Sequence, residues 1–106
     1  MIARIWKGTV RREDGDEYAR YVNDTGLSAY AQTAGNRGAW MLRRDVGDTT
    51  EFLTFSLWDS IDAVKAFAGE DYEAAVYYPE DDRFLVERDD RVSHFQVVHR
   101  SAEAPA

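Results

Sequence analysis

The chain has 106 residues, a formal net charge of −7 and no cysteine. This length suits one domain with a single core, and the acidic balance argues against nucleic-acid or anionic-membrane partners, which need clustered Lys and Arg. The lack of cysteine excludes disulfides, thiolate metal sites and a cysteine nucleophile. The N-terminal run is not a signal peptide, and no apolar stretch approaches the roughly 20 residues that cross a bilayer, so we expect a cytoplasmic protein.

The first predicted elements are a strand and a helix. Residues 2–10 alternate between two faces and are rich in residues that favour β structure. From Asp16 onward, apolar and aromatic residues recur at three- and four-residue spacing, which predicts one buried helical face. Gly26 is expected to break or bend this helix, which then continues to Gln32.

A hairpin and a second helical region follow. Residues 38–45 and 51–58 alternate as two strands, and the residues between them predict a tight turn. Asp59 or Ser60 is placed to cap a helix that carries an apolar stripe. The sequence predicts a break at Gly69 and then more helix over residues 71–78.

The last predicted elements are a short helical turn that begins at Pro79 and a strand over residues 91–99. The acidic run at 80–82 is expected to lie in solvent at the start of that turn. Residues 1–99 then form a single domain, and residues 100–106 are expected to be a disordered tail. The order β-α-β-β-α-β is typical of an α+β, ferredoxin-like fold, in which helices cover one face of an antiparallel sheet.

The other face of that sheet is predicted to be apolar. A surface of this kind is normally buried against a partner, so we expect a homodimer that pairs sheet against sheet. The reverse assignment of the two faces stays open, because a shift of one residue exchanges them. The residues assigned to the outer face are Ile5, Met41, Leu53, Phe55, Leu57, Phe95 and Val97.

The helix-covered face combines aromatic and polar residues. A largely apolar cavity with a few polar groups is typical of a small-molecule site, and a flat aromatic or polyketide-like ligand would suit it; simple core packing is the alternative. The sheet residues assigned to this face are Arg4, Trp6, Trp40, Thr54, Ser56, Trp58, His94 and Gln96. The helical residues expected to close over it are Tyr18, Tyr21, Val22, Phe67, Tyr72 and Val76.

His94 is the leading catalytic candidate, because an imidazole can remove a phenolic or carbon-bound proton near neutral pH. A hydrogen-bonded core histidine is the alternative interpretation. No set of side chains converges as a metal site, and no nucleotide-binding or serine-hydrolase motif is present. We therefore expect chemistry without a metal or a cofactor.

Three segments, SLWDS at the strand-to-helix junction, F-A-G-E-D-Y-E-x-A after it and VSHFQVV near the end, together resemble the antibiotic biosynthesis monooxygenase-like family. That family belongs to the dimeric α+β-barrel superfamily, and the resemblance covers residues 2–98. It implies a dimeric α+β barrel and cofactor-independent monooxygenation of an aromatic or polyketide-like compound. A polyketide cyclase or isomerase, a non-catalytic binding dimer and a heme-handling protein are the alternatives.

The resemblance carries over few functional residues. Heme-degrading members use an Asn, a Trp and a His where this chain has Trp6, Phe67 and Tyr77, which disfavours heme degradation. Quinone-forming members use a Trp and an Asn where this chain has Phe67 and Ala63. We therefore assign catalysis to His94 and Tyr72. The predicted substrate-binding residues are Trp6, Trp58, Phe67, Tyr77, Tyr18, Val22 and Arg4.

Overall fold

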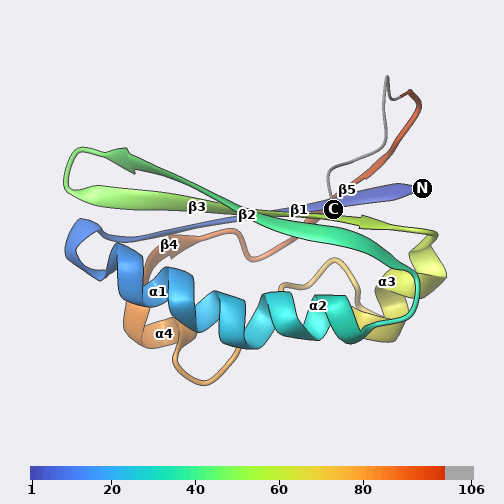
Figure 1. The fold of residues 1–106 in the computed structure, drawn as a ribbon, viewed down its shortest axis with the longest axis horizontal. Helices are drawn as coiled ribbons and strands as arrows, with labels where there is room; N and C mark the ends of the chain where they lie inside the picture. The colour runs from blue at the N-terminus through green and yellow to red at the C-terminus, as the bar shows by residue number, and fades with distance from the viewer. Residues whose placement is uncertain (100–106) are drawn as a thin grey trace.

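The computed structural model describes residues 1–99, and the predicted tail at 100–106 lies outside the described residues. Its α+β architecture confirms the predicted class: helices cover one face of a five-stranded antiparallel sheet (Figure 1). No helix in residues 1–99 is long and apolar enough to cross a membrane. The strands are β1 (Ile2–Arg11), β2 (Asn36–Val46), β3 (Thr49–Trp58), β4 (Leu85–Arg88) and β5 (Ser93–Gln96). The helices are η1 (Arg12–Asp14), α1 (Gly15–Val22), η2 (Asn23–Leu27), α2 (Ser28–Gln32), α3 (Ile61–Ala68) and α4 (Asp81–Phe84).

Two short strands share one edge of β1. The strand order is β2-β3-β1-β4, and β5 also pairs with β1. The β4 strand pairs with residues 8–10, whereas β5 pairs with residues 2–5. The β4 strand was not predicted from the sequence, and the predicted last strand extends beyond the four residues of β5. Four-residue strands show too few alternating positions for the pattern to mark their ends.

The first helical region runs through Gly26 without a break. It changes from α1 to one π-helical turn, η2, and then to α2. A π turn inserts an extra residue into the helix and re-aims the side chains around it. The face of α1 that meets the sheet helps form a core cluster of Val10, Tyr18, Val22, Phe52 and Phe84.

The predicted helix over residues 71–78 is wrong: this segment is irregular. Gly69, with φ of +88°, ends α3, and the position before Pro79 disfavours helical backbone. The segment instead bonds to the chain that precedes β5. The Val92 N–H donates to the Glu73 carbonyl at 2.7 Å, and the Ala75 N–H donates to the Asp90 carbonyl at 3.2 Å.

The two faces of β2 are the reverse of those predicted. Val46 pairs with Thr49 across a two-residue turn, and Gly47, with φ of +59°, occupies its first central position, as in type II′ hairpins. This register pairs Trp40 with Phe55 and Met41 with Thr54. Met41 therefore packs against the core under the helices, and Trp40 lies on the outer face.

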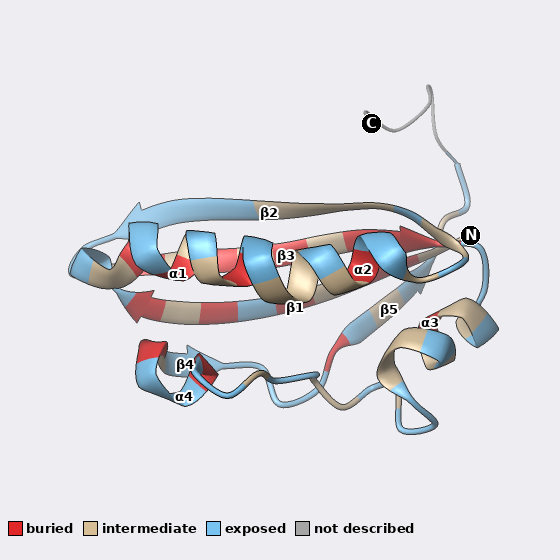
Figure 2. Ribbon diagram, turned by 60° about the horizontal axis from the view of Figure 1, so that its bottom comes forward, coloured by how far each residue is buried: buried red, intermediate tan, exposed pale blue. Residues whose placement is uncertain are grey.

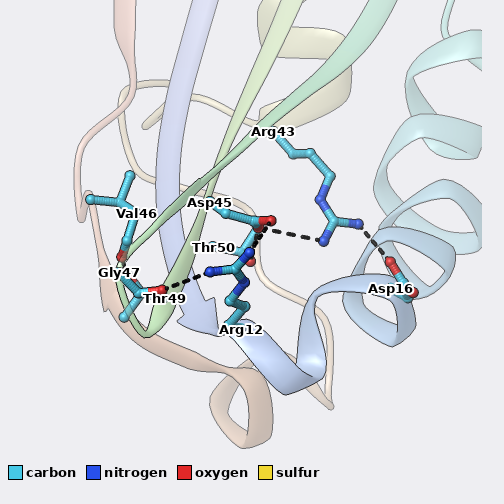
Figure 3. A network of polar contacts seen from close by, with 8 residues as sticks. All are labelled: Arg12, Asp16, Arg43, Asp45, Val46, Gly47, Thr49 and Thr50. Atoms are coloured by element: carbon cyan, nitrogen blue, oxygen red, sulfur yellow. Dashed lines mark hydrogen bonds and ion pairs between the residues drawn. The ribbon is translucent and has the colours of Figure 1, made fainter.

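Buried residues concentrate in β1 and β3, while β2 is mostly intermediate or exposed (Figure 2). A network of ion pairs and hydrogen bonds connects the β2–β3 hairpin to η1 and α1, where the helical layer begins (Figure 3). Arg43 pairs with Asp16 at 2.8 Å, and Arg12 pairs with Asp45 at 3.4 Å. The hydrogen bond from Thr50 is the main cause that lowers the pKa of Asp45. Arg43 and Arg12 thus each form an ion pair with an acidic residue at the protein surface.

Candidate functional site

A cavity of about 50 Å³ lies between the helix-covered face of the sheet and the irregular segment after α3. Its walls come from β1, β3, the α1–η2–α2 region, α3, residues 75–78, Asp81 and Val92, and six of the fifteen lining residues are aromatic. Four polar side chains, Arg4, Thr25, Thr54 and Asp81, interrupt this apolar wall. The lining residues are Arg4, Trp6, Tyr18, Val22, Thr25, Gly26, Tyr30, Thr54, Phe67, Ala75, Val76, Tyr77, Tyr78, Asp81 and Val92.

Arg4 is the positively charged residue of the cavity lining, and it is only 2% exposed. One Nη atom donates to the Tyr72 carbonyl at 2.7 Å and to His94 Nε2 at 2.8 Å. Its Nε atom is a buried side-chain polar atom for which the described residues supply no hydrogen-bond partner. Burial lowers the pKa of Arg4 from its ordinary value, yet guanidinium remains charged in proteins. A buried cation with a spare donor favours an anionic ligand.

His94 and Tyr72 lie behind Arg4 and do not line the cavity. Because arginine can only donate, His94 Nε2 must accept, which places the proton of a neutral ring on Nδ1. Burial and then the charge of Arg4 lower the pKa of His94. The Tyr72 ring packs edge-on against the imidazole, with centroids 5.1 Å apart. Both residues therefore position Arg4 in this arrangement.

The predicted substrate-binding residues fall into two groups. Trp58 is completely buried outside the cavity lining, where its indole N–H donates to Ser56 Oγ at 2.9 Å and its ring packs with Tyr30. Trp6 arches over Gly8, which has no Cβ to collide with the indole, and donates to the Asp89 carbonyl at 2.9 Å. The predicted residues that do line the cavity are Arg4, Trp6, Tyr18, Val22, Phe67 and Tyr77.

Asp81 is the main lining residue that the sequence analysis missed. The acidic run was expected in solvent, but Asp81 is only 5% exposed. It accepts hydrogen bonds from the Tyr78 N–H at 2.6 Å and from the Tyr18 hydroxyl at 3.4 Å. The bond to Tyr78, three residues earlier, is the local pattern by which an acidic side chain caps a short helix. Proline two positions before Asp81 was a signal for that cap, whereas contact with Tyr18 required the tertiary fold.

Substitution of Asp81 by asparagine is expected to stabilise the fold at pH values above the range in which a carboxyl group ordinarily titrates. Burial is the main cause that raises the pKa of Asp81 in the folded state. The stability that this group contributes is therefore present below its unfolded pKa and lost as pH rises through the raised folded pKa. Thermal unfolding at pH 3 and pH 8 checks this: the melting temperatures of wild type and Asp81→Asn should agree at pH 3, and the variant should melt higher at pH 8. A lower melting temperature at pH 8 would contradict it.

The cavity is small. Its outer wall is part of the segment 71–78, which was predicted as a helix and is irregular. A single water needs roughly 10–15 Å³ on the same scale, and sites for larger ligands hold about 300–1,000 Å³. Val76 and Tyr77 form part of the outer wall and are also exposed. A ring system can therefore enter only if residues 75–78 move outward. Within residues 1–99, no cluster of three or more His, Cys, Asp or Glu side chains is arranged to hold a metal ion.

Fold and cavity together define a ferredoxin-like α+β domain with an aromatic site between sheet and helices. No protein-family model and no curated protein sequence matches the chain. Solved structures match over almost its whole length. A putative antibiotic biosynthesis monooxygenase from Bacillus cereus has a TM-score of 0.65 at 16% identity and covers 95% of this chain and 96% of its own. Rv0793 from Mycobacterium tuberculosis has a TM-score of 0.63 at 18% identity, over 95% of this chain and 98% of its own.

The heme-degrader MhuD from Mycobacterium tuberculosis, solved with two hemes in its active site, is a third structural neighbour. Its TM-score is 0.65 at 18% identity, over 96% of this chain and 100% of that chain. The chain thus has the fold of antibiotic biosynthesis monooxygenase proteins, which confirms the resemblance at the level of the fold. At these identities the likeness concerns the fold alone.

Proposed function

We propose that the protein is a cofactor-independent monooxygenase that acts on an ionisable aromatic or polyketide-like compound. The observation that carries this proposal is the buried Arg4 guanidinium, whose Nε lacks a partner among the described residues, in the lining of an aromatic cavity. Aromatic walls favour a flat ring, and a buried cation favours a phenolate or enolate. Structural neighbours described as putative antibiotic biosynthesis monooxygenases support the same class of reaction.

In this reaction Arg4 stabilises the anion that forms when the substrate loses a proton. A preorganised cation in a site that excludes water is a large source of transition-state stabilisation. The electron-rich carbanion then reacts directly with oxygen. For an anthrone the balance is C14H10O + O2 → C14H8O2 + H2O, so oxygen is the only co-reactant. His94 and Tyr72, the predicted catalytic residues, act here by holding Arg4 in place.

Oxygen uptake with anthrone tests this proposal. The full chain is assayed without added metal or flavin, and the quinone is quantified beside the oxygen consumed. We expect protein-dependent uptake with one O2 consumed per quinone. Saturable binding of anthrone without oxygen uptake would overturn the monooxygenase proposal and favour a non-catalytic binding protein, while an isomeric product formed without oxygen would favour a cyclase or isomerase.

Heme does not fit the site as it stands. The described lining residues include no histidine that could ligate the iron, and His94 Nε2 is occupied by Arg4. We therefore derive no step through heme. Titration of the protein with hemin should leave the Soret band at the position of free hemin.

We also propose that the protein forms a homodimer through the outer face of its sheet. Trp40 and Phe55 pack together there with ring centroids 5.6 Å apart, while Leu42 and Phe95 are 54% and 56% exposed. An apolar face of this kind is normally covered by a partner, and in a homodimer the same face of each chain can cover the other about a two-fold axis.

The double substitution Leu42→Lys and Phe95→Lys is expected to convert the dimer into a monomer, because it places like charges at an apolar interface. Size-exclusion chromatography with light scattering measures the mass, which is 12.1 kDa for one chain. Ala66→Lys, on the exposed side of α3, is the matched control and should leave the dimer intact. A wild-type mass of one chain at micromolar concentration would contradict the proposal.

A further inference from the structure

We propose that Asp81, an acidic residue from the start of α4, is the general base that removes the substrate proton. This inference rests on the proposed monooxygenase function and assigns its first chemical step. The reaction needs a proton acceptor inside the cavity. Asp81 is a carboxylate that lines the same cavity as Arg4 and is only 5% exposed.

The contacts of Asp81 leave it able to accept a proton from a ligand. A carboxylate offers about four lone-pair positions, and the described residues fill two of them, through the Tyr78 N–H at 2.6 Å and the Tyr18 hydroxyl at 3.4 Å. The first bond is short and fixes the carboxylate to the backbone. The second is long, so Oδ1 is the less firmly bound oxygen and the one we assign to the substrate.

Its neighbours in the sequence behave differently. Glu80 and Asp82 are exposed and pair with Arg83 and Arg88 on the surface. Asp81 alone in this run is buried, and it accepts a hydrogen bond from the hydroxyl of Tyr18 on α1, 63 residues away in the chain. Helix capping by itself does not require such burial, because caps are satisfied equally well at the surface.

The surroundings of Asp81 strengthen its carboxylate as a base. Burial raises its pKa, while the hydrogen bonds from Tyr78 and Tyr18 lower it. A carboxylate with a raised pKa is a stronger base than a solvated one. The titratable and charged groups that face it are Tyr18 and Tyr21 on α1, Tyr77 and Tyr78 on the segment before α4, Asp82 on α4 and Arg88 on β4.

His94 is less suited to this role. Its Nε2 lone pair is occupied by the Arg4 N–H at 2.8 Å, and a fixed cation next to the ring opposes the gain of a proton. Asp81 lies in the lining of the cavity, whereas His94 does not. The arrangement separates two tasks, with proton removal at Asp81 and charge stabilisation at Arg4.

The proposed step balances in protons and electrons. The CH2 group of the anthrone, opposite its carbonyl, loses one proton to Asp81 Oδ1, and the electron pair stays on the substrate as an enolate beside Arg4. Oxygen takes up two electrons in forming a new C–O bond, which gives a peroxide anion. Protonated Asp81 returns its proton to that anion, and the hydroperoxide loses water to leave the quinone C=O.

Hydrogen–deuterium exchange of anthrone under anaerobic conditions tests the base separately from oxygenation. The full-length wild-type protein should accelerate the exchange, and Asp81→Asn should lower the accelerated rate about 100-fold or more, as expected for loss of a general base. Glu80→Gln removes a neighbouring exposed carboxylate and should retain the wild-type rate. Equal exchange rates in wild type and Asp81→Asn, or no acceleration by wild type, would overturn the role of Asp81. Oxygen uptake measured in parallel reports the proposed function independently.

A pH profile of the same exchange rate, measured in a second variant, covers the case in which Asp81→Asn fails to fold. The hydrogen bond from Tyr18 lowers the pKa of Asp81, so Tyr18→Phe should move the rising limb of the profile to higher pH. A merely structural role for Asp81 would change the rate without moving the limb. If Tyr18→Phe folds and the rising limb of its pH profile stays at the wild-type position, the proposal is contradicted.

Discussion

Substitution of Arg4 by glutamine is expected to lower kcat/KM for an anthrone-type substrate by about 100-fold or more. Removal of one preorganised group that stabilises developing negative charge costs about 10²–10³ in rate. Arg4 is the cation that lines the cavity at 2% exposure. The loss should fall mainly on kcat, because the neutral substrate carries no charge for Arg4 to bind before proton removal. Steady-state oxygen uptake across substrate concentrations measures both constants.

Three further variants define what Arg4 contributes. Arg4→Lys keeps the charge but loses the planar fork, so it should recover part of the activity. His94→Gln should weaken turnover less than Arg4→Gln, because Arg4 would retain its bond to the Tyr72 carbonyl. Arg20→Gln removes an exposed arginine from α1 and serves as the matched control. If folded Arg4→Gln kept the wild-type kcat, the proposed anion site would be refuted.

Substitution of Trp58 by alanine is expected to lower the free energy of unfolding by about 3–5 kcal/mol, the usual range for a large buried aromatic side chain. Trp58 is completely buried and packs against Tyr30 and Phe67, with ring centroids at 5.9 and 5.8 Å. Its replacement also leaves the Ser56 hydroxyl without the indole donor at 2.9 Å. Urea unfolding followed by circular dichroism measures the change.

Smaller substitutions separate packing from hydrogen bonding at this position. Trp58→Phe retains most of the ring volume and should cost less than Trp58→Ala, while Ser56→Ala removes only the indole's acceptor and should cost about 1 kcal/mol. Val86→Ala, at a residue 54% exposed, is the surface control and should stay within about 0.5 kcal/mol of wild type. A Trp58→Ala cost near that of the surface control would show that Trp58 is not a core residue.

The sequence by itself determined the elements that depend on local patterns. Alternation predicted β1 and β3, and three- and four-residue spacing predicted the helices on either side of the hairpin. Of the two predicted caps for α3, Asp59 and Ser60, it is Ser60 that accepts the bond from the Ala63 N–H. The same alternation placed Arg4 and Trp6 on the helix-covered face. These features need only neighbouring residues, because strand and helix periods are properties of a short stretch of chain.

The register of β2 was also available locally but was misassigned. A two-residue turn at Gly47 and Asp48 pairs Val46 with Thr49 and then places Met41, rather than Trp40, under the helices. In a hairpin, the turn length decides which face each side chain takes. The short β4 strand and the irregular segment at 71–78 had weaker local signals, because pairing with distant chain decides them.

Only the tertiary structure decided how the candidate site is assembled. Asp81 lies in an acidic run typical of a solvated surface, and its burial depends on Tyr18 from α1. Likewise, Arg4 and His94 are 90 residues apart in the chain and form a hydrogen bond in the fold. This bond occupies the lone pair with which His94 was predicted to act as a base. Such burial and pairing arise from packing between distant parts of the chain. They change the pKa of a side chain, and the residues next to it in the sequence do not show this.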